Sequence, residues 1–565
     1  MPRNESHIAA VLLILGLSAS AVVGCFSREG VVQFDDLTHY LYAHWAWRWP
    51  AYLLDAWGRP GFTALYFLPA RLGWWPCRLF SAVLTAATAW LAFRIAQRLG
   101  LRHAWAVVPL CYAQPLFFQL SLTTLTETAL AFYLTLAMCL ALHRRWAWSA
   151  AVLSVGLLTR HEAIVFLPIW CWYAWRDRSA GRLENPPACS SPSVGSTAGP
   201  AASLVSPAAG RAAHGIAATA LRLSPVLWAP ILVNLVSWAV GMETTISRLF
   251  QAKPASIYGH GGPLTYFCRS MEAWGPGVMI LAMTGLTTLW RKPRGGAMVA
   301  ASAVVFFAAQ TAVRALGLYE SGGYARFLVP ISPLVAVAAL AGWHRLWADD
   351  FREWRMAIVT ALGSMVVLWI AMEWQIVLLL QHRDEVAELP RLDLAILAVR
   401  IATAVVVILA VVSLVRAGAP FWARFSRAAV PVSALILIVL ACGALCHPLW
   451  KSTEAGIVDE LCGWLKQNGY GGRMIISNHP WIDYVTGQQL PPGRPAVRQR
   501  LEQAPVGTLF VWDDQFAGKL DPALPLRVFT SSPSFRLIHQ TRPMTYRTEP
   551  YLTVLELVRP WSGEP

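Results

Sequence analysis

The chain has 565 residues, of which 56% are hydrophobic and 14% are charged, and its mean hydropathy is +0.47. One apolar run after another reaches the length that crosses a bilayer, so the composition excludes a single water-soluble core and indicates a polytopic membrane protein. The formal net charge is +15, but the basic residues gather at the ends of apolar segments, where they orient a chain in the membrane, so no nucleic-acid partner is expected.

The apolar segments, in chain order, predict about 13 membrane-spanning helices of the usual length. They lie near residues 8–26, 76–97, 104–121, 123–142, 146–158, 162–175, 222–240, 274–290, 296–314, 326–344, 356–380, 393–415 and 428–447. The first segment has a signal peptide as an alternative, and Val22-Val23-Gly24-Cys25 resembles a lipoprotein cleavage box. An uncleaved first span is the simpler interpretation, because a chain with so many further spans gains little from a lipid anchor.

The stretch 146–175 is expected to cross the membrane twice, as two short arms that meet at Arg160, His161 and Glu162. One continuous helix would place Arg160 in mid-bilayer, at a cost of about 2.5–3.5 kcal/mol. With two arms and a cytoplasmic N-terminus, the basic clusters at the span ends all become cytoplasmic in an inner-membrane protein, as the positive-inside bias requires. The outer face then receives residues 27–75, 159–161, 241–273, 315–325, 381–392 and everything after 448.

Two segments outside the spans differ in composition. Residues 179–215 are rich in Ser, Pro, Ala and Gly without periodicity, which predicts a disordered cytoplasmic loop. After Trp450 the composition becomes that of a soluble domain, with one amphipathic helix and strands near 474–476, 509–511 and 551–557. We therefore expect a transmembrane catalytic region over 1–447, with 27–75 as its first outer loop, and a small extracytoplasmic α/β domain over 448–565. His479 in that domain is a weak functional candidate, for which turn chemistry is the alternative.

The chemistry must work without a soluble nucleotide. The sequence has no Walker A, GxGxxG or DxD motif, and its ten Cys lack the spacing of a zinc site or a disulfide framework. An enzyme on the outer face has neither ATP nor nucleotide sugars to draw on, so group transfer there requires a donor already activated on a lipid. A polyprenyl phosphate that carries a sugar fits this description.

Asp35 and Asp36 lie in the first outer loop, directly before an aromatic-rich helical stretch. One carboxylate would act as general base and take the proton from an acceptor hydroxyl, while its neighbour orients it or holds a divalent cation. Adjacent carboxylates repel each other, which favours a shared proton, a metal ion on Asp35 and Asp36, or a nearby Arg. The structural alternative is that one of them caps the following helix, which would lie along the membrane interface.

Arg59, Arg160 and Arg326 are the cationic candidates for binding the donor phosphate. A departing lipid phosphate gains negative charge in the transition state, so guanidinium groups aimed at it in a water-poor cavity would make the largest catalytic contribution. The alternatives are that Arg59 snorkels to head groups and that Arg160 merely pairs with Glu162. Arg326 begins a span on the outer face, where the topology rule disfavours a positive charge, and this favours a functional role.

Further polar residues are expected to line the substrate cavity. Glu127 lies one turn into the fourth span, and an intramembrane acid is a candidate for orienting an Arg or the acceptor. His260 and Tyr258 lie in a Gly-rich outer loop, where a solvated His is the alternative. The full set is Glu127, His161, Glu162, Tyr258, His260 and Tyr324.

These motifs resemble those of the GT-C superfamily of membrane glycosyltransferases, in particular the protein O-mannosyltransferase and aminoarabinose-transferase-like group with its RgtA/B/C/D-like bacterial relatives. Phe34-Asp35-Asp36 is similar to the Asp-Glu motif of the first outer loop, and Arg59-Pro60 to the basic-Pro step before the second span. Residues 122–127 are similar to the family's Thr-Glu, 159–163 to its Thr-Arg-x-Glu turn, and 324–330 to its Arg-Tyr/Phe-x-x-Pro segment. Order, spacing and common sidedness carry the resemblance over most of the chain.

The resemblance implies a GT-C type fold and an inverting transfer from a polyprenyl-phosphate sugar to a protein, glycan or lipid acceptor. It implies Asp35 as the base, because Asp35 matches the family's first acid, whereas Asp36 stands where the family has Glu and leaves metal use open. Two alternatives come from other classes of protein: a transporter or flippase of a lipid-linked glycan, and a structural membrane subunit. The transporter is disfavoured by the lack of an internal inverted repeat.

Overall fold

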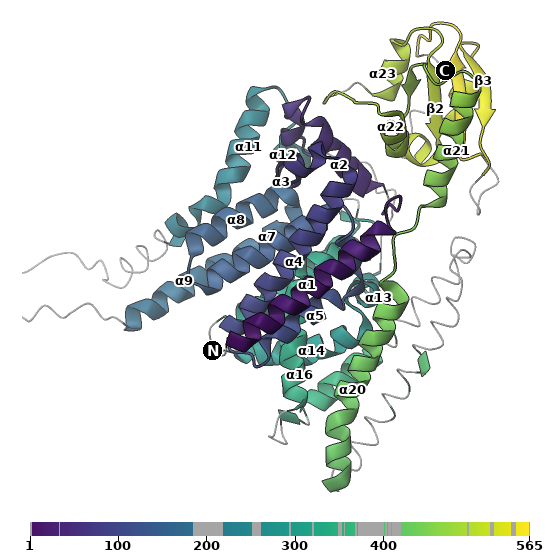
Figure 1. Cartoon of the computed structure of the whole chain (residues 1–565). Helices are drawn as coiled ribbons and strands as arrows, with labels where there is room; N and C mark the ends of the chain where they lie inside the picture. Colours follow the sequence, from purple (N-terminus) through teal and green to yellow (C-terminus); the bar gives the residue numbers. More distant parts are fainter. Residues whose placement is uncertain are drawn as a thin grey trace, which may run out of the picture.

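The computed structural model describes residues 3–32, 34–184, 219–250, 262–292, 295–318, 321–347, 353–354, 356–367, 370, 400–401, 404, 408, 420–493, 496–519, 525–543 and 550–563. These residues form an elongated helical body and a C-terminal α/β domain (Figure 1).

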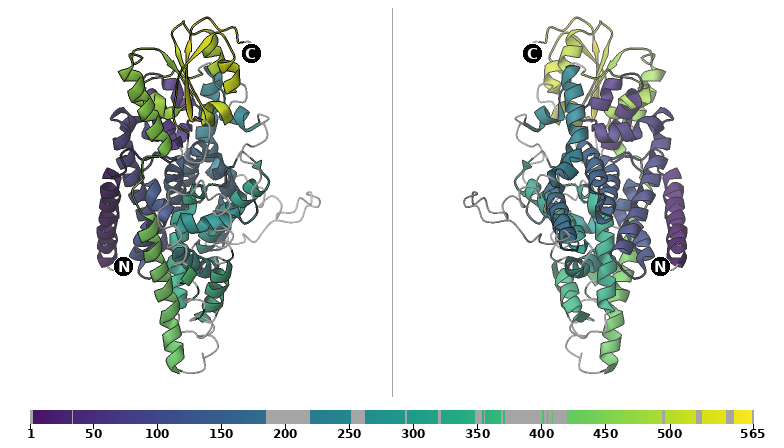
Figure 2. Two further views of the ribbon diagram at one scale, coloured as in Figure 1. Left: turned by 90° about the vertical axis from the view of Figure 1, so that its right-hand side faces the viewer. Right: turned by 90° about the vertical axis from the view of Figure 1, so that its left-hand side faces the viewer.

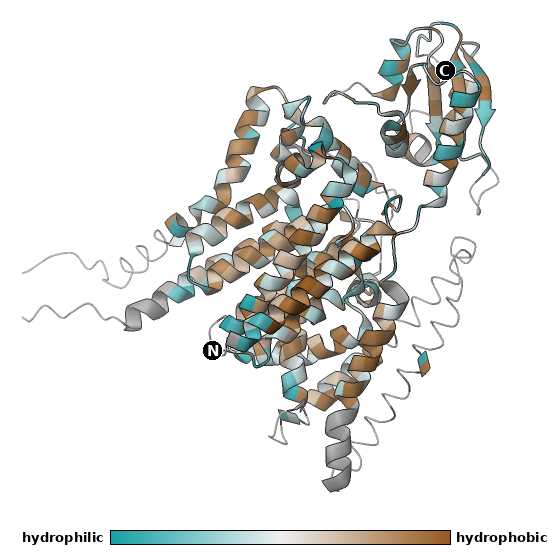
Figure 3. Cartoon of the chain, viewed as in Figure 1, coloured by the Kyte–Doolittle hydropathy of each residue, from teal (hydrophilic) through white to brown (hydrophobic). Residues whose placement is uncertain are grey.

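The body consists of apolar helices at the positions of the predicted spans. The main ones are α1 (Arg3–Cys25), α4 (Trp74–Arg98), α7 (Thr126–Leu142), α8 (Trp146–Thr159), α9 (Leu167–Glu184), α11 (Trp228–Ala239), α14 (Pro276–Arg291), α15 (Gly296–Ala315), α16 (Ser332–Leu346) and α20 (Pro420–Leu445). Within the described residues, five helices are long and apolar enough to cross a membrane, and four shorter apolar helices accompany them. Figure 3 shows the hydrophobic middle of these helices in brown. The predicted polytopic helical fold is confirmed; the predicted span 393–415 lies mostly outside the described residues.

The break predicted at residues 160–162 is present. Helix α8 ends at Thr159, Arg160 is extended (φ −153°, ψ 131°), and the short helix η3 (His161–Phe166) leads into α9. Helix α9 continues to Glu184 and so enters the predicted loop 179–215, whose residues from 185 onward lie outside the described part of the chain. The two arms are therefore separate helices, as the cost of a buried Arg requires.

The predicted span 104–121 is not one helix, which corrects the expectation from hydropathy. It is divided into η2 (Ala104–Ala106), α5 (Val107–Tyr112) and α6 (Pro115–Leu120). Pro115 biases Gln114 away from the helical region, and Gln114 is extended (φ −88°, ψ 115°). The buried Gln114 amide donates to the Ser332 carbonyl at 2.9 Å, which ties the interruption to the body's centre.

The centre of the body is a close pair of helices, α14 and α16. The apolar window within Ala325–Leu346 is 94% buried. A Cβ added at Gly285 would overlap the carbonyl oxygen of Ala338, and one added at Gly342 would overlap that of Leu281. Small residues at these crossings allow the two backbones to touch, as is common between membrane helices.

The first loop folds back onto one end of the body. It contains α2 (Asp35–Trp45), η1 (Pro50–Leu54) and α3 (Pro60–Arg71). Both views of Figure 2 place the C-terminal domain at this same end. The Tyr52 hydroxyl donates to the Leu490 carbonyl at 2.6 Å, and one continuous apolar cluster joins the loop to the domain.

The C-terminal domain carries a four-stranded sheet of order β1-β2-β4-β3. Its elements are α21 (Thr453–Gln467), β1 (Ile475–Ile476), α22 (Pro480–Thr486), α23 (Val497–Glu502), β2 (Leu509–Asp513), α24 (Leu526–Thr530), β3 (Phe535–Gln540) and β4 (Leu552–Leu557). Strands β1 and β2 are parallel, whereas β4 is antiparallel to both β2 and β3, with Val511 opposite Val554. The three predicted strands are present. Strand β3 lies at a sheet edge, and its largely exposed residues, apolar and polar in equal number without strict alternation, give only a weak strand signal.

Candidate functional site

The two adjacent aspartates begin α2 and serve different partners. Phe34 occupies the N-cap position with a left-handed backbone (φ 56°, ψ −9°), and no side chain caps the helix. Consecutive helical residues point in directions about 100° apart. Asp35 consequently reaches Arg326, whereas Asp36 points toward α4 and Arg78.

Asp36 is fully buried and holds the first loop against α4. Its carboxylate lies 3.5 Å from the Arg78 guanidinium and accepts from the Leu37 amide at 2.8 Å. Arg78 also donates to the carbonyls of Ser27 and Gly30, and the Thr124 hydroxyl donates to the Asp36 carbonyl at 2.6 Å. Burial raises the pKa of Asp36 to about 6, against the lowering effect of Arg78. These contacts are those of a structural anchor.

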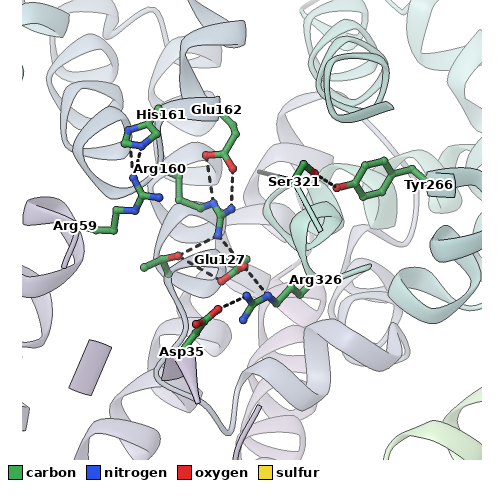
Figure 4. Close-up of polar contacts among 10 residues, drawn as sticks. Asp35, Arg59, Glu127, Arg160, His161, Glu162, Tyr266, Ser321 and Arg326 are labelled. Atoms are coloured by element: carbon green, nitrogen blue, oxygen red, sulfur yellow. Dashed lines mark hydrogen bonds and ion pairs between the residues drawn. The ribbon is translucent and has the colours of Figure 1, made fainter. Parts of the chain in front are cut away.

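Asp35 belongs to a network that joins four distant parts of the chain (Figure 4). Its carboxylate contacts Arg326, whose Nε lies 3.5 Å from Glu127. Arg160 lies 2.7 Å from Glu127 and 2.7 Å from Glu162. Arg160 also donates to the hydroxyl of Thr126 at 3.1 Å. The structure thus brings Asp35, Glu127, Glu162 and two of the three predicted arginines together.

Arg59 approaches the same region from the first loop. Its backbone is in a sparsely populated conformation (φ 64°, ψ 92°), which costs about 1–3 kcal/mol and is typical of functional sites. Asp55 fixes the preceding turn by accepting from the amides of Trp57 and Gly58 at 2.9 and 2.7 Å. The Arg59 guanidinium contacts the imidazole of His161 (Figure 4), so the third predicted arginine lies directly beside the turn that carries Arg160.

Aromatic rings flank the guanidinium groups. The Phe327 ring centre lies 4.7 Å from Arg160 and 5.5 Å from Arg326. The Tyr324 ring centre lies 5.2 Å from Arg326. Rings at these distances stabilise a cation and exclude water from it. Tyr324 was predicted as a cavity residue, whereas Phe327 has no sequence signal beyond its place in the 324–330 motif.

The charges of the network balance. The guanidinium groups of Arg59, Arg160 and Arg326 equal in number the carboxylates of Asp35, Glu127 and Glu162. Arg160 and Arg326 are each only 8% exposed, and the Nη1 of Arg326 has no hydrogen-bond partner in the described part of the chain. A buried guanidinium with an unused N–H group is costly unless an acceptor arrives. The site is thus equipped to receive an anion.

The predictions for the outer-loop residues and for a metal ion have different outcomes. Tyr258 and His260 lie outside the described residues. For a metal ion, Asp35 and Asp36 contact different arginines, and no three or more His, Cys, Asp or Glu side chains within the described ranges are grouped to hold one. The residues present therefore do not fit a divalent cation on the aspartate pair.

The site includes residues that were not predicted. His39 follows Asp35 by one helical turn and is 7% exposed, with its ring stacked on Trp57 at 5.0 Å. Thr126 binds Arg160 as described above. Helical spacing from Asp35 was a usable signal for His39, because positions four apart share a face. Thr126 has a signal in the Thr-Glu resemblance of residues 122–127, whereas Trp57 has none apart from its closeness to Arg59 in the sequence.

Side chains of the C-terminal domain pack around Phe34, the residue before Asp35. Phe34 is 2% exposed, and its ring lies 4.9 Å from His479, 6.2 Å from Trp481 and 6.2 Å from Phe516. These three rings belong to the domain, and their edge-to-face arrangement is the favoured one for aromatic pairs. The domain consequently fixes the start of α2, and with it the position of Asp35.

Comparisons with known proteins identify the fold. No protein-family model and no curated protein sequence matches the chain. Among solved structures, it is similar to ArnT from Cupriavidus metallidurans bound to undecaprenyl phosphate, with 14% identity and a TM-score of 0.53 over 96% of this chain and 97% of that one. The apo state of that ArnT gives 12% identity and a TM-score of 0.52 over 97% and 98%. The predicted GT-C type fold is therefore confirmed.

Proposed function

We propose that this chain is an inverting glycosyltransferase of the cytoplasmic membrane. It moves a sugar from a polyprenyl-phosphate donor to an acceptor hydroxyl on the outer face. The observation that carries this proposal is the network in which Asp35, Glu127, Arg160 and Arg326, from four distant parts of the chain, meet in a GT-C type fold, with Arg59 beside it on His161. The similar ArnT structure that holds undecaprenyl phosphate supports a lipid phosphate as the ligand.

The donor phosphate would bind at the arginines. Arg326 has an unused Nη1, and Arg160 lies close by on the other side of Glu127. A phosphate that enters a charge-balanced network is held by groups already in place, so little reorganisation is needed as negative charge develops on it. The rings of Phe327 and Tyr324 lower the water content around the same groups.

Asp35 would be the general base, and its environment differs from that of Asp36 in the required way. The Asp35 side chain is 39% exposed, whereas that of Asp36 is fully buried against Arg78. At rest Asp35 pairs with Arg326. A donor phosphate competes for Arg326 and so frees the carboxylate to accept a proton from the acceptor hydroxyl.

The reaction then runs as a single displacement. The acceptor oxygen forms a bond to the anomeric carbon as its proton passes to Asp35. The bond between that carbon and the phosphate oxygen breaks, and the polyprenyl phosphate leaves with both electrons of the bond, stabilised by Arg160 and Arg326. Attack opposite the leaving group inverts the configuration at the anomeric carbon.

Mass spectrometry of cell-envelope glycans, with and without the gene, tests the proposal. We expect one glycosylated product to disappear on deletion, to return with the wild-type gene and to stay absent with Asp35→Asn. The Asp35→Asn protein is expected to insert normally and to bind undecaprenyl phosphate at least as tightly as wild type, since the guanidinium groups remain and the carboxylate that competes for Arg326 is gone. Asp177→Asn is the matched control, because Asp177 pairs with Arg144 at 3.0 Å outside the site. Normal glycan from the Asp35→Asn strain would refute the base.

The same strains separate this function from its main alternative. A flippase of a lipid-linked glycan would leave the transferred sugar on its donor lipid, so the lipid-linked species and not the product would change on deletion. The proposed sidedness is checked independently by reporter fusions after Ser190 and after Trp450, which we expect on opposite faces of the membrane.

A further inference from the structure

One polar side chain of the site has no role in the reaction described above. His39 lies on α2, four residues after Asp35, on the face of the helix that carries the base. Its imidazole stacks on Trp57 at 5.0 Å and packs against Phe62 at 5.2 Å. Two aromatic neighbours thus fix the ring, although its Nδ1 has no hydrogen-bond partner in the part of the chain that the structure describes.

The charge state of His39 suits a neutral ligand group. Burial, together with the positive charges of Arg59, Arg326 and Arg160, lowers the pKa of the imidazole well below its ordinary value. His39 is therefore neutral at physiological pH, with one N–H group to donate and one nitrogen to accept.

That combination is distinct from the chemistry of its neighbours. Guanidinium groups only donate hydrogen bonds, and ionised carboxylates only accept them. A sugar hydroxyl does both. A neutral imidazole adds nothing to phosphate binding that the three arginines lack, but it matches a hydroxyl in either direction.

The position of His39 points to the same ligand. In the displacement described above, the sugar must lie between the base and the leaving phosphate. His39 shares a helix face with Asp35, whose carboxylate pairs with Arg326. The space between the base and the leaving phosphate therefore lies on the side of α2 that carries His39.

We propose that His39 hydrogen-bonds a hydroxyl of the donor's sugar and that Trp57 holds the imidazole in place for that contact. This inference rests on the proposed function and adds a residue that binds the sugar of the donor instead of its phosphate. His39 is more than nine-tenths buried and its Nδ1 is unpaired among the described residues, which is explained if the ligand supplies the missing partner.

The test compares His39→Phe with His39→Gln. Phenylalanine keeps the stacking but loses both hydrogen-bonding groups, whereas glutamine restores a donor and an acceptor. Each variant is expressed in a strain that lacks the gene, and its membrane vesicles, which contain the native donor and acceptor, give the initial rate of product formation. Binding of sugar-free undecaprenyl phosphate to the purified variants is measured in parallel.

We expect His39→Phe to lower the transfer rate about tenfold, as for the loss of one well-made hydrogen bond. We expect His39→Gln to recover most of that rate, and both variants to bind undecaprenyl phosphate within about twofold of wild type. His44→Phe is the matched control on the same helix, since His44 is engaged with the Ala70 carbonyl at 2.9 Å, and it should transfer at a rate near that of wild type.

Three results would overturn the inference. One is a wild-type rate for His39→Phe. Another is an equal loss of transfer and of undecaprenyl-phosphate binding in that variant, which would assign His39 to the phosphate or to the helix. The third is an equal loss in His44→Phe. If wild-type vesicles make no product, the proposed function fails first, and the inference falls with it.

Discussion

Lowering the pH below 6.5 is expected to loosen the C-terminal domain from the first loop, because a neutral, buried imidazole joins them. His479 is fully buried, and its Nδ1 accepts from the Trp481 amide at 3.2 Å. The Nε2 must then carry the proton that it donates to the Tyr551 hydroxyl, also at 3.2 Å. Burial lowers the pKa of His479 to about 3.

The size of the stability loss follows from the difference between the pKa values of His479 in the exposed and the buried state. An exposed His479 takes up a proton near pH 6.5, whereas the buried one does so only near pH 3. The stability that it contributes is therefore fully present above pH 6.5 and falls by about 1.4 kcal/mol per pH unit between those values. At pH 5 the loss is about 2 kcal/mol.

Asp36 changes the stability with pH in the opposite direction. Asp36, whose pKa is raised to about 6, takes up its proton more readily in the folded chain, so its contribution grows as the pH falls through 6. His539, whose pKa is lowered by partial burial, acts in the same direction as His479. The pH dependence of the protein's stability is therefore the sum of these contributions, and a variant is needed to isolate that of His479.

His479→Asn provides that isolation. Its side-chain oxygen can accept from the Trp481 amide, and it does not titrate. Hydrogen exchange of the α22 amides in the full-length protein, corrected for intrinsic exchange rates, gives the opening free energy at each pH. We expect wild type to lose about 2 kcal/mol more than the variant between pH 7 and 5. Parallel pH curves for the two proteins would refute this reasoning, whatever constant offset separates them.

Two further substitutions test the Asp36–Arg78 pair and the close contact between α14 and α16. Arg78→Gln should destabilise the protein by about 3–5 kcal/mol at pH 7.5, because it leaves the buried carboxylate of Asp36 without a counter-ion, while Asp35→Asn should change stability little; thermal unfolding in detergent separates the two, and equal midpoints would contradict the different roles of the two aspartates. Gly285→Ala should lower the unfolding midpoint by forcing α14 away from the Ala338 carbonyl, whereas Gly363→Ala, where nothing lies within 4 Å of the added carbon, should not; similar midpoints for both would count against the close helix contact.

Several of the charged residues singled out in the sequence lie together in the structure, because membrane physics constrains charged residues strongly. Arg160 and Glu127 are expensive in lipid, so each required a partner or a cavity, and in the structure they are paired with each other. Arg326 was singled out by its unfavourable side of the membrane. It contacts Asp35, 291 residues away.

The sequence could not show in which direction each side chain of a helix points. Asp35 and Asp36 are chemically identical neighbours. Only the rotation of α2 about its own axis decides which carboxylate is exposed and which is buried. His39 and Phe327 required the same information, because burial and ring contacts depend on which helix packs against which. The interruption of 104–121 was missed for a related reason: hydropathy averages over a window and does not register the effect of Pro115 on the residue before it.

The long sequence separation between Asp35 and Arg326 has a consequence for biosynthesis. At about 5–20 residues per second, the ribosome finishes Arg326 some 15–60 s after Asp35. The rings of the C-terminal domain that hold Phe34 are translated later still. A nascent chain already inserted in the membrane therefore carries a lone carboxylate without its counter-ions, and a protein truncated before residue 449 would lack the support that keeps that carboxylate in register.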